Sequence, residues 1–428
     1  MECSCMSSLG PNVSKELSEL TARHPCYSFE AHRQFARMHL PVAPNCNVQC
    51  NYCNRKYDCV NESRPGVTSE ILAPEAARDK FIRVKQALSN LSVVGIAGPG
   101  DALANWDQVK QSIRFIKNED SDCIFCLSTN GLMLPQYGPE IIELGVKHVT
   151  VTVNCVNPVI GAGIYHHVDY QGQRYIGEEA AEILMTNQMA GVKYLAENGV
   201  LVKINIVMIP DLNADHIPLV VKKVKRLGAV LTNIMPLIPA IGSAFEKMPQ
   251  TRMKDIQAMR ELCRTDITQM EHCQQCRADA IGRLTEDLSY QFSKHLCASQ
   301  PEFKGAIKGK TAKYKVAVTS KYKKLVDLHY GHAEDFHIYE VDGNYSTFLE
   351  TRKIQKYCTG RVDCDDSEAM KDLAVKTIAD CNAVLTMRIG YNAQKKLIDH
   401  GIAIIESCNT VEEGLKEAAR RLEMKPAI

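Results

Sequence analysis

The chain alternates short apolar runs with longer amphipathic segments between residues 38 and 237. The runs are rich in Val and Ile and predict strands, while apolar residues that recur three and four positions apart predict helices. The predicted strands are Met38–Ala43, Val93–Ala97, Cys123–Ser128, His148–Asn154, Leu201–Ile209 and Val230–Leu237. The predicted helices lie near residues 74–90, 105–117, 137–144, 177–198 and 214–227. Repeated strand–helix units predict an α/β fold, and six of them predict a full or partial TIM-type (β/α) barrel.

Two predicted strands have one polar face. Thr150, Thr152 and Asn154 alternate with valines, and Lys203 and Asn205 alternate with apolar residues. In a barrel the apolar faces meet the outer helices, so these polar residues are expected to line a ligand cavity in the lumen. The alternative is an antiparallel sheet with one solvated face.

The first predicted strand is followed by a C-x-x-x-C-x-x-C stretch that contains Cys46, Cys50 and Cys53. Three thiolates at this spacing hold a [4Fe–4S] cluster and leave one iron open. The alternatives are a structural zinc site with Cys59 as fourth ligand, or three cysteines that are simply packed together. The stretch, with Tyr52 before its last cysteine, resembles the signature of the radical S-adenosylmethionine (SAM) superfamily. The resemblance implies that SAM binds the open iron and is split reductively to a 5′-deoxyadenosyl radical.

Further residues follow the second and third predicted strands. The second ends in a glycine-rich segment, residues 95–101, that lets a ligand approach the backbone closely. By itself it indicates no more than a turn. The radical SAM resemblance implies a contact with the amino group of SAM, although the usual Gly-Gly-Glu form is altered here. The predicted SAM-binding residues are Tyr52, Gly98, Asp101, Ser128, Asn130, Asn154 and Asn205.

A second cysteine set lies near residue 270. Residues 251–268 form a predicted amphipathic helix with Cys263 on its inward face, and Cys273 and Cys276 follow in a C-x-x-C loop. These three thiolates are candidates for a second cluster with an open iron. A structural zinc site that includes His272 is the alternative.

His24 and Cys26 flank a proline, and alternate residues of an extended segment face the same way. They are candidate ligands for a third cluster, although a surface turn is an alternative. Strand parity places Cys126 on the face of Ser128 and Cys123 on the opposite face. A set of His24, Cys26 and Cys126 requires the N-terminal segment to cross the barrel mouth beside the Cys46–Cys53 loop.

Several segments together resemble the radical SAM enzymes of nitrogenase cofactor assembly: residues 24–28, 46–53, 62–67, 128–131 and 272–279. Residues 330–336 resemble a NifX-type cluster-carrier domain. The resemblance implies fusion of two [4Fe–4S] clusters into an eight-iron core with a SAM-derived carbide and an added sulfur. It implies three clusters, one that binds SAM and two precursors. Glu62 is a weaker candidate for a temporary ligand or proton acceptor, and a solvated loop carboxylate is its alternative.

The resemblance also implies partners: iron–sulfur cluster donor proteins, a ferredoxin or flavodoxin-type electron donor, and scaffold or carrier proteins of the nitrogenase cofactor. Two other functions fit the cysteine pattern. One is a radical SAM enzyme that modifies a peptide or small molecule and has auxiliary clusters. The other is a non-enzymatic iron–sulfur carrier, which would not cleave SAM.

Composition narrows these choices. The chain has 428 residues with a net charge of +1, so we expect no nucleic-acid or membrane partner. Its 18 cysteines, without an apolar signal segment at the start, favour metal binding in the cytoplasm over disulfides. We expect an N-terminal ligand segment at 1–37, a radical SAM barrel at 38–295, a linker at 296–312 and a NifX-like domain at 313–428.

Overall fold

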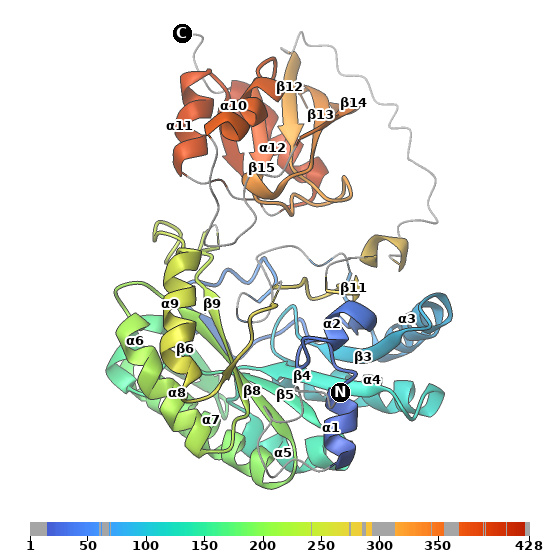
Figure 1. Cartoon of the computed structure of the whole chain (residues 1–428), viewed down its shortest axis with the longest axis vertical. Helices are drawn as coiled ribbons and strands as arrows, with labels where there is room; N and C mark the ends of the chain where they lie inside the picture. The colour runs from blue at the N-terminus through green and yellow to red at the C-terminus, as the bar shows by residue number, and fades with distance from the viewer. Residues whose placement is uncertain are drawn as a thin grey trace, which may run out of the picture. The chain divides into compact units, whose positions relative to one another are not determined.

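The computed structural model of this chain divides into two compact units, unit 1 (Met1–Cys297) and unit 2 (Ala298–Ile428) (Figure 1). It describes residues 15–59, 61, 68, 70–240, 242–273, 275–284, 288–292, 313–343, 345–354, 368–387, 389, 391–407 and 409–423. The linker expected at 296–312 therefore lies outside the described residues. Within the described part of the chain, no helix has both the length and the apolar composition that a membrane span needs.

Unit 1 is built on an eight-stranded sheet with the order β10-β9-β8-β5-β4-β3-β1-β11. Its strands are β1 (Ala36–His39), β3 (Leu91–Ile96), β4 (Ile124–Thr129), β5 (His148–Thr152), β8 (Leu201–Met208), β9 (Leu231–Pro236), β10 (Thr268–Gln269) and β11 (Ile281–Gly282). All neighbours are parallel except β11, which pairs with β1 in the antiparallel sense. The edge strands β10 and β11 do not pair with each other among the described residues. The α/β prediction is confirmed, with a partial barrel.

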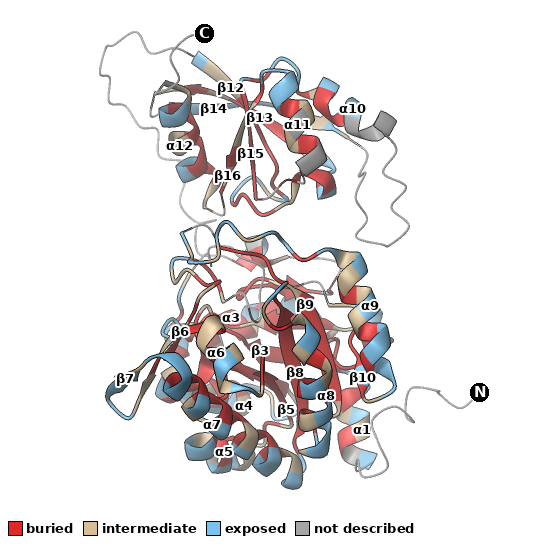
Figure 2. Cartoon of the chain, turned by 90° about the vertical axis from the view of Figure 1, so that its left-hand side faces the viewer, coloured by how far each residue is buried: buried red, intermediate tan, exposed pale blue. Residues whose placement is uncertain are grey.

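Helices cover the outer side of this curved sheet in both views (Figures 1 and 2). They are α3 (Pro74–Ala87), α4 (Trp106–Glu119), α5 (Leu134–Glu143), α7 (Gly177–Glu197), α8 (Ile217–Arg226) and α9 (Met253–Arg264). The outward-facing strand residues, such as Val149, Val151 and Ile204, pack with the helices in the main hydrophobic core. The expected alternation is therefore correct: the apolar face meets the helices, and the polar face is left to the lumen.

Short elements that the sequence pattern did not indicate complete the strand ends. They are β2 (Val48–Cys50), α6 (Pro158–Ile164), β6 (Tyr165–Tyr170), β7 (Gln173–Tyr175) and the 3-10 turns η2 (Ala102–Asn105), η3 (Ala214–His216) and η4 (Ser289–Phe292). The strands β2, β6 and β7 form a separate three-stranded sheet. The strands β2 and β7 have only three residues each, too few for a periodicity to be detected in the sequence.

The N-terminal segment, with α1 (Lys15–Thr21) and α2 (Ala31–Gln34), covers the amino-terminal ends of the strands. Tyr27 donates its hydroxyl hydrogen to the carbonyl oxygens of Val149 and Leu201, at 3.2 and 3.3 Å. Ser92, near the start of β3, donates to the carbonyl oxygen of Arg23 at 2.7 Å. The expectation that this segment crosses the barrel mouth beside the Cys46–Cys53 loop is wrong, because those contacts hold it at the opposite end.

Unit 2 contains a five-stranded sheet with the order β14-β13-β12-β15-β16. Its elements are β12 (Lys313–Val318), η6 (Tyr330–His332), β13 (Asp335–Asp342), β14 (Tyr345–Lys353), α10 (Glu368–Thr377), β15 (Ala383–Thr386), α11 (Tyr391–Asp399), β16 (Ala403–Glu406) and α12 (Val411–Glu423). Two hydrophobic clusters pack against the sheet, which gives unit 2 a core of its own.

Candidate functional site

The loop after β1 carries the three-cysteine stretch. Gln49 closes this loop by donating from Nε2 to the carbonyl oxygens of Cys50 and Cys53, at 3.0 and 2.8 Å. Cys50 and Cys53 are buried and Cys46 is half-buried. All three line one cavity, so the structure brings the predicted set together.

Burial raises the pKa of each of these thiols. It is the largest cause in every case and raises the pKa of Cys46 to about 12. The neighbouring thiols Cys53 and Cys46, which line the same cavity, raise the pKa of Cys50 further. Such thiols are protonated at neutral pH and become thiolates when a metal displaces the protons. Three converging thiols therefore fit a metal cluster.

Tyr52 anchors the loop to the barrel strands. Its hydroxyl accepts a hydrogen bond from Asn154 Nδ2 at 2.7 Å and donates one to Asn61 Oδ1. Asn205 Nδ2 donates to the carbonyl oxygen of Asn61 at 2.9 Å. Tyr52 and Asn61 line the cysteine cavity, whereas Asn154 is fully buried. Asn154 and Asn205 thus act on the loop through Tyr52 and Asn61.

Asp101 is saturated with donors from its own chain. Its carboxylate accepts from the backbone N–H of Leu103 and Ala104 at 2.9 and 3.2 Å, and from Thr129 Oγ1 at 3.0 and 3.1 Å. The backbone N–H of Asn130 is a further donor. Burial raises the pKa of Asp101, and these hydrogen bonds oppose the rise. The carboxylate therefore joins the end of β3 to the end of β4.

The remaining predicted SAM-binding residues occupy different positions. Ser128 and Asn130 line the cysteine cavity, and Asn130 Nδ2 lies 3.8 Å from Cys46 Sγ. Gly98 has a φ of 138°, which favours glycine, and its carbonyl oxygen accepts from the N–H of Ala43 at 3.3 Å. Gly98 thus shapes the loop by its backbone, whereas Ser128 and Asn130 offer side chains to a ligand.

A second cavity lies in the barrel lumen and shares Ser128 with the first. Its lining includes His24, Cys26, Cys126, Lys203, Cys273 and Cys276. Burial is the largest cause that raises the pKa of Cys26 to about 11, and Cys276 and Cys273 raise it as well. The structure therefore gathers four cysteines from three distant parts of the sequence around one space. The parity expectation for Cys126 is confirmed.

His24 has a defined hydrogen-bond state. Its Nδ1 accepts from the backbone N–H of Cys26 at 3.1 Å, and its Nε2 is buried with no hydrogen-bond partner in the described part of the chain. Burial holds the pKa of His24 well below 6.5, and the rings of Tyr27 and His148 lie 4.7 and 4.6 Å from it. A neutral imidazole that accepts through Nδ1 carries its proton on Nε2. Iron binding through Nε2 thus requires that proton to leave or the Cys26 hydrogen bond to break.

Cys263 is the predicted ligand that the structure keeps apart from the others. It lies on α9, is 1% exposed and belongs to the main hydrophobic core. Its Sγ is 4.0 Å from Met259 Sδ. Burial raises the pKa of the Cys263 thiol, and the positive charge of Lys222 on α8 opposes this rise. The inward face of α9 packs on the outer side of the sheet, whereas Cys273 and Cys276 face the lumen. The set of Cys263, Cys273 and Cys276 is therefore not assembled in this structure.

The cysteines also bear on the choice between zinc and iron–sulfur chemistry. No group of three or more His, Cys, Asp or Glu side chains, among those described, converges on a single metal position. Structural zinc needs four ligands on one ion. The thiolates of an iron–sulfur cluster each bind a different iron, so they need only surround a common space. Cys46, Cys50 and Cys53 surround a common cavity in this way.

Sequence reasoning missed two neighbours of the cysteine loop. Arg55 lines the first cavity and lowers the pKa of Cys53 and Cys46 against the effect of burial. Asn61 carries the Tyr52 contact described above. Arg55 stands two positions after Cys53 in the sequence. A cation so close to three cysteines could have been identified as a neighbour of the site from the sequence alone. Glu62 lies outside the described residues.

A three-cysteine loop after the first strand of a partial (β/α) barrel defines a radical SAM protein, which uses a [4Fe–4S] cluster and SAM. Accordingly, residues 40–224 match the radical SAM superfamily. Residues 312–421 match the family described as dinitrogenase iron-molybdenum cofactor.

Relatives identify the protein more closely. The FeMo cofactor biosynthesis protein NifB of Klebsiella pneumoniae is 43% identical, over 90% of this chain and 87% of its own. The NifB of Frankia alni is 38% identical, over 98% of this chain and 92% of its own. Among solved structures, Streptococcus suis SuiB is 14% identical with a TM-score of 0.41, over 61% of this chain and 56% of its own. This chain belongs to the NifB family, and it is a radical SAM enzyme of FeMo cofactor biosynthesis.

Proposed function

We propose that this enzyme makes the eight-iron, carbide-containing precursor of the nitrogenase cofactor. Two [4Fe–4S] clusters are its substrates, one SAM donates a methyl group, and a second SAM supplies the radical that removes hydrogen from it. An added sulfur completes the product. The observation that carries the proposal is the pair of cysteine-lined cavities that meet at Ser128. A SAM carbon held in the first cavity has only a short path to a cluster in the second.

Cys46, Cys50 and Cys53 hold the resident cluster. When bound, that cluster supplies the electron that splits SAM. Ser128 and Asn130 are the side chains placed to contact SAM, because they line the same cavity. The other SAM-site residues act indirectly: Tyr52, Asn154 and Asn205 position the loop, and Asp101 and Gly98 shape the β3–β4 edge.

The lumen holds the two substrate clusters, which brings the total to three clusters per chain. His24, Cys26 and Cys126 bind one of them, and Cys273 and Cys276 bind the other. The sequence adds Cys263 to the second set and Glu62 as a temporary ligand or proton acceptor. Sites with few strong protein ligands suit substrates that must leave after fusion.

The lumen must widen when it is loaded. The cavity measures about 60 Å³, room for roughly two water molecules. The side chains that line it must therefore move apart to admit a cluster. Cys273 and Cys276 lie in the chain between β10 and β11, the two edge strands of the sheet. Because no pairing joins these two edge strands among the described residues, we expect clusters to enter on this side.

The expected partners follow from this chemistry. Iron–sulfur donor proteins load the lumen, and a ferredoxin or flavodoxin-type protein reduces the resident cluster. Unit 2, with its match to a cofactor-binding family, acts as the carrier domain that passes the product to scaffold proteins. A cytoplasmic location agrees with the need for reduced thiols.

The decisive experiment is anaerobic incubation of cluster-loaded protein with dithionite and SAM that carries a ¹³C-labelled methyl group. We expect S-adenosylhomocysteine, 5′-deoxyadenosine and ¹³C inside a newly formed cluster. The Cys46→Ala variant should form none of the 5′-deoxyadenosine. A peptide- or metabolite-modifying enzyme would cleave SAM without altering its own iron–sulfur content, and a carrier would not cleave SAM at all.

A separate comparison tests the ligand role of Cys263. If only lumen-facing thiols bind the second substrate cluster, Cys273→Ala loses that cluster and Cys263→Ala keeps it. Iron and sulfide are counted per chain after anaerobic reconstitution. Equal loss in both variants would show that α9 shifts on loading and that the sequence-based set is correct.

A further inference from the structure

A buried hydroxyl group in the lumen lacks a hydrogen-bond partner. Thr150 of β5 lines the lumen cavity and is 1% exposed. Its Oγ1 is buried and makes no hydrogen bond within the part of the chain that the structure describes. Removing a hydroxyl from water without giving it a partner costs free energy, so such a group calls for an explanation. Valine has nearly the same shape and occupies the adjacent positions Val149 and Val151, so shape alone does not require threonine here.

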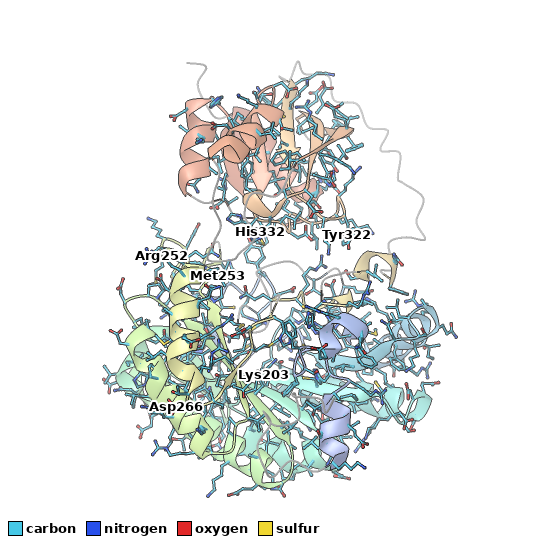
Figure 3. The ribbon with its side chains drawn as sticks, viewed as in Figure 1. Lys203, Arg252, Met253, Asp266, Tyr322 and His332 are labelled. Atoms are coloured by element: carbon cyan, nitrogen blue, oxygen red, sulfur yellow. The ribbon has the colours of Figure 1, made fainter. Side chains whose placement is uncertain are left out.

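The register of the sheet places Thr150 beside the point where the two cavities meet. Thr150 pairs with Ser128 of β4, the residue that lines both cavities. Neighbouring strands lie about 4.8 Å apart, so these two side chains are adjacent on the lumen face. On its other side Thr150 pairs with Lys203 of β8, which also lines the lumen and is labelled in Figure 3. Two residues further along β5, Thr152 lines the first cavity. The Thr150 hydroxyl therefore lies where a substrate in the lumen comes nearest to SAM.

The chemistry of the lumen indicates what this hydroxyl binds. Cys126 lies on the same face of β4 as Ser128, and it is one of the proposed ligands of a substrate cluster. The sulfurs of an iron–sulfur cluster accept hydrogen bonds, and a threonine hydroxyl has one hydrogen to donate. Any water in the lumen must leave when a cluster enters. The hydroxyl then needs a partner on the cluster itself.

We propose that Thr150 is a substrate-binding residue whose hydroxyl donates a hydrogen bond to a sulfide of the cluster held by His24, Cys26 and Cys126. The bond orients this cluster so that one edge faces Ser128 and the SAM cavity. This inference rests on the proposed function. It adds a residue that sets the orientation of the substrate cluster, whereas the thiolates retain it.

A pair of variants separates this role from a structural one. Thr150→Val removes the hydroxyl at nearly constant shape, and Thr150→Ser retains it. Thr232→Val is the matched control, because Thr232 of β9 is 0% exposed and its Oγ1 also lacks a partner among the described residues. Strand parity places Thr232 on the face opposite Asn233, which lines the lumen. Both changes to valine remove an unpartnered hydroxyl, so neither should lower the melting temperature of the metal-free chain.

The experiment uses the full chain after anaerobic reconstitution. It measures the iron content, the reduction potentials by titration followed by EPR, and the rate at which SAM is converted to S-adenosylhomocysteine. A hydrogen bond to a cluster sulfur stabilises the reduced, more negative cluster and so raises its potential. Thr150→Val should keep its iron, titrate at lower potential in the lumen and transfer the methyl group roughly tenfold more slowly, the order of effect of one hydrogen bond. Thr150→Ser and Thr232→Val should resemble the unaltered protein. If Thr150→Val does not fold, Thr150→Ala removes the same hydroxyl.

The outcomes are distinct. Unchanged potentials and unchanged methyl transfer in Thr150→Val would overturn the inference and leave the proposed function intact. Equal defects in Thr150→Val and Thr150→Ser would overturn it too, because side-chain shape rather than the hydroxyl would then matter. Equal defects in Thr150→Val and Thr232→Val would show a general effect on the barrel and would also overturn it. An unaltered chain that loads only the SAM-binding cluster would refute the proposed function and, with it, this inference.

Discussion

Gly100→Ala tests how tightly the β3 loop sets the position of the cysteine loop. The backbone N–H of Gly100 donates to the carbonyl oxygen of Ala43 at 2.6 Å, and that of Asp101 donates to Asn45 at 2.8 Å. Asn45 directly precedes Cys46. A methyl group at position 100 therefore acts on the first ligand of the resident cluster.

The magnitude follows from the geometry. A Cβ built on Gly100 lies 2.1 Å from the carbonyl oxygen of Asn45, 0.9 Å short of the 3.0 Å that real Cβ atoms respect. The obstructing atoms are backbone, so no side-chain rotation relieves the clash, and the segment before Cys46 must move by a similar distance. Overpacking of this kind costs about 1–3 kcal/mol. For a unit of this size, with an unfolding entropy of about 0.6 kcal/mol/K, it lowers the melting temperature by roughly 2–5 °C.

The effect on chemistry should exceed the effect on stability. A displacement of about 1 Å in a reacting geometry costs on the order of a hundredfold in rate. The assay measures 5′-deoxyadenosine after anaerobic reconstitution, with dithionite and SAM, next to a melting curve. Gly138→Ala, on α5, is the matched control, because its Cβ meets only the Tyr194 side chain. The free energy of unfolding of that variant should stay within about 1 kcal/mol of the parent value, and the variant should cleave SAM normally. A Gly100→Ala protein that cleaves SAM at the parental rate would refute the reasoning.

Three further predictions address other parts of the molecule. Burial, followed by the charge of Asp279, raises the pKa of Asp58 from 3.8 to about 7. Between these two pH values the folded protein keeps a proton on Asp58 that the unfolded chain has lost. The free energy of unfolding therefore falls as the pH rises from about 4 to about 7. In urea titrations of the metal-free protein, Asp58→Asn should gain stability relative to the parent between pH 5 and pH 7, and a pH-independent difference would contradict this. Cys26→Ala and Cys126→Ala should each lose about four iron atoms per chain yet still cleave SAM, whereas unchanged iron and product would exclude the N-terminal segment as a source of ligands. A chain ending at residue 297, the last of unit 1, should still make the carbide-containing cluster, because unit 2 supplies none of the proposed ligands; failure of a fully loaded truncation would place unit 2 in the chemistry.

Local backbone geometry let the sequence determine much of this protein. Strand parity placed Thr150, Lys203 and Asn205 in the lumen, and the structure has them there. The spacing of Cys46, Cys50 and Cys53 is short enough for one loop to hold them, so their convergence needed no knowledge of distant residues. Strand-helix alternation likewise gave the α/β class, since side-chain direction repeats every two residues in strands and about every 3.6 in helices.

Only the tertiary structure decided which distant segments meet. Helical periodicity showed that Cys263 is buried, but it could not say on which side of the sheet α9 packs. It was the Tyr27 hydrogen bonds to β5 and β8 that placed the N-terminal segment at the amino-terminal ends of the strands. The hydrogen bonds from Thr129, at the end of β4, to the carboxylate of Asp101 likewise join residues far apart in the sequence. Each of these outcomes depends on contacts between residues far apart in the chain, and no local pattern records them.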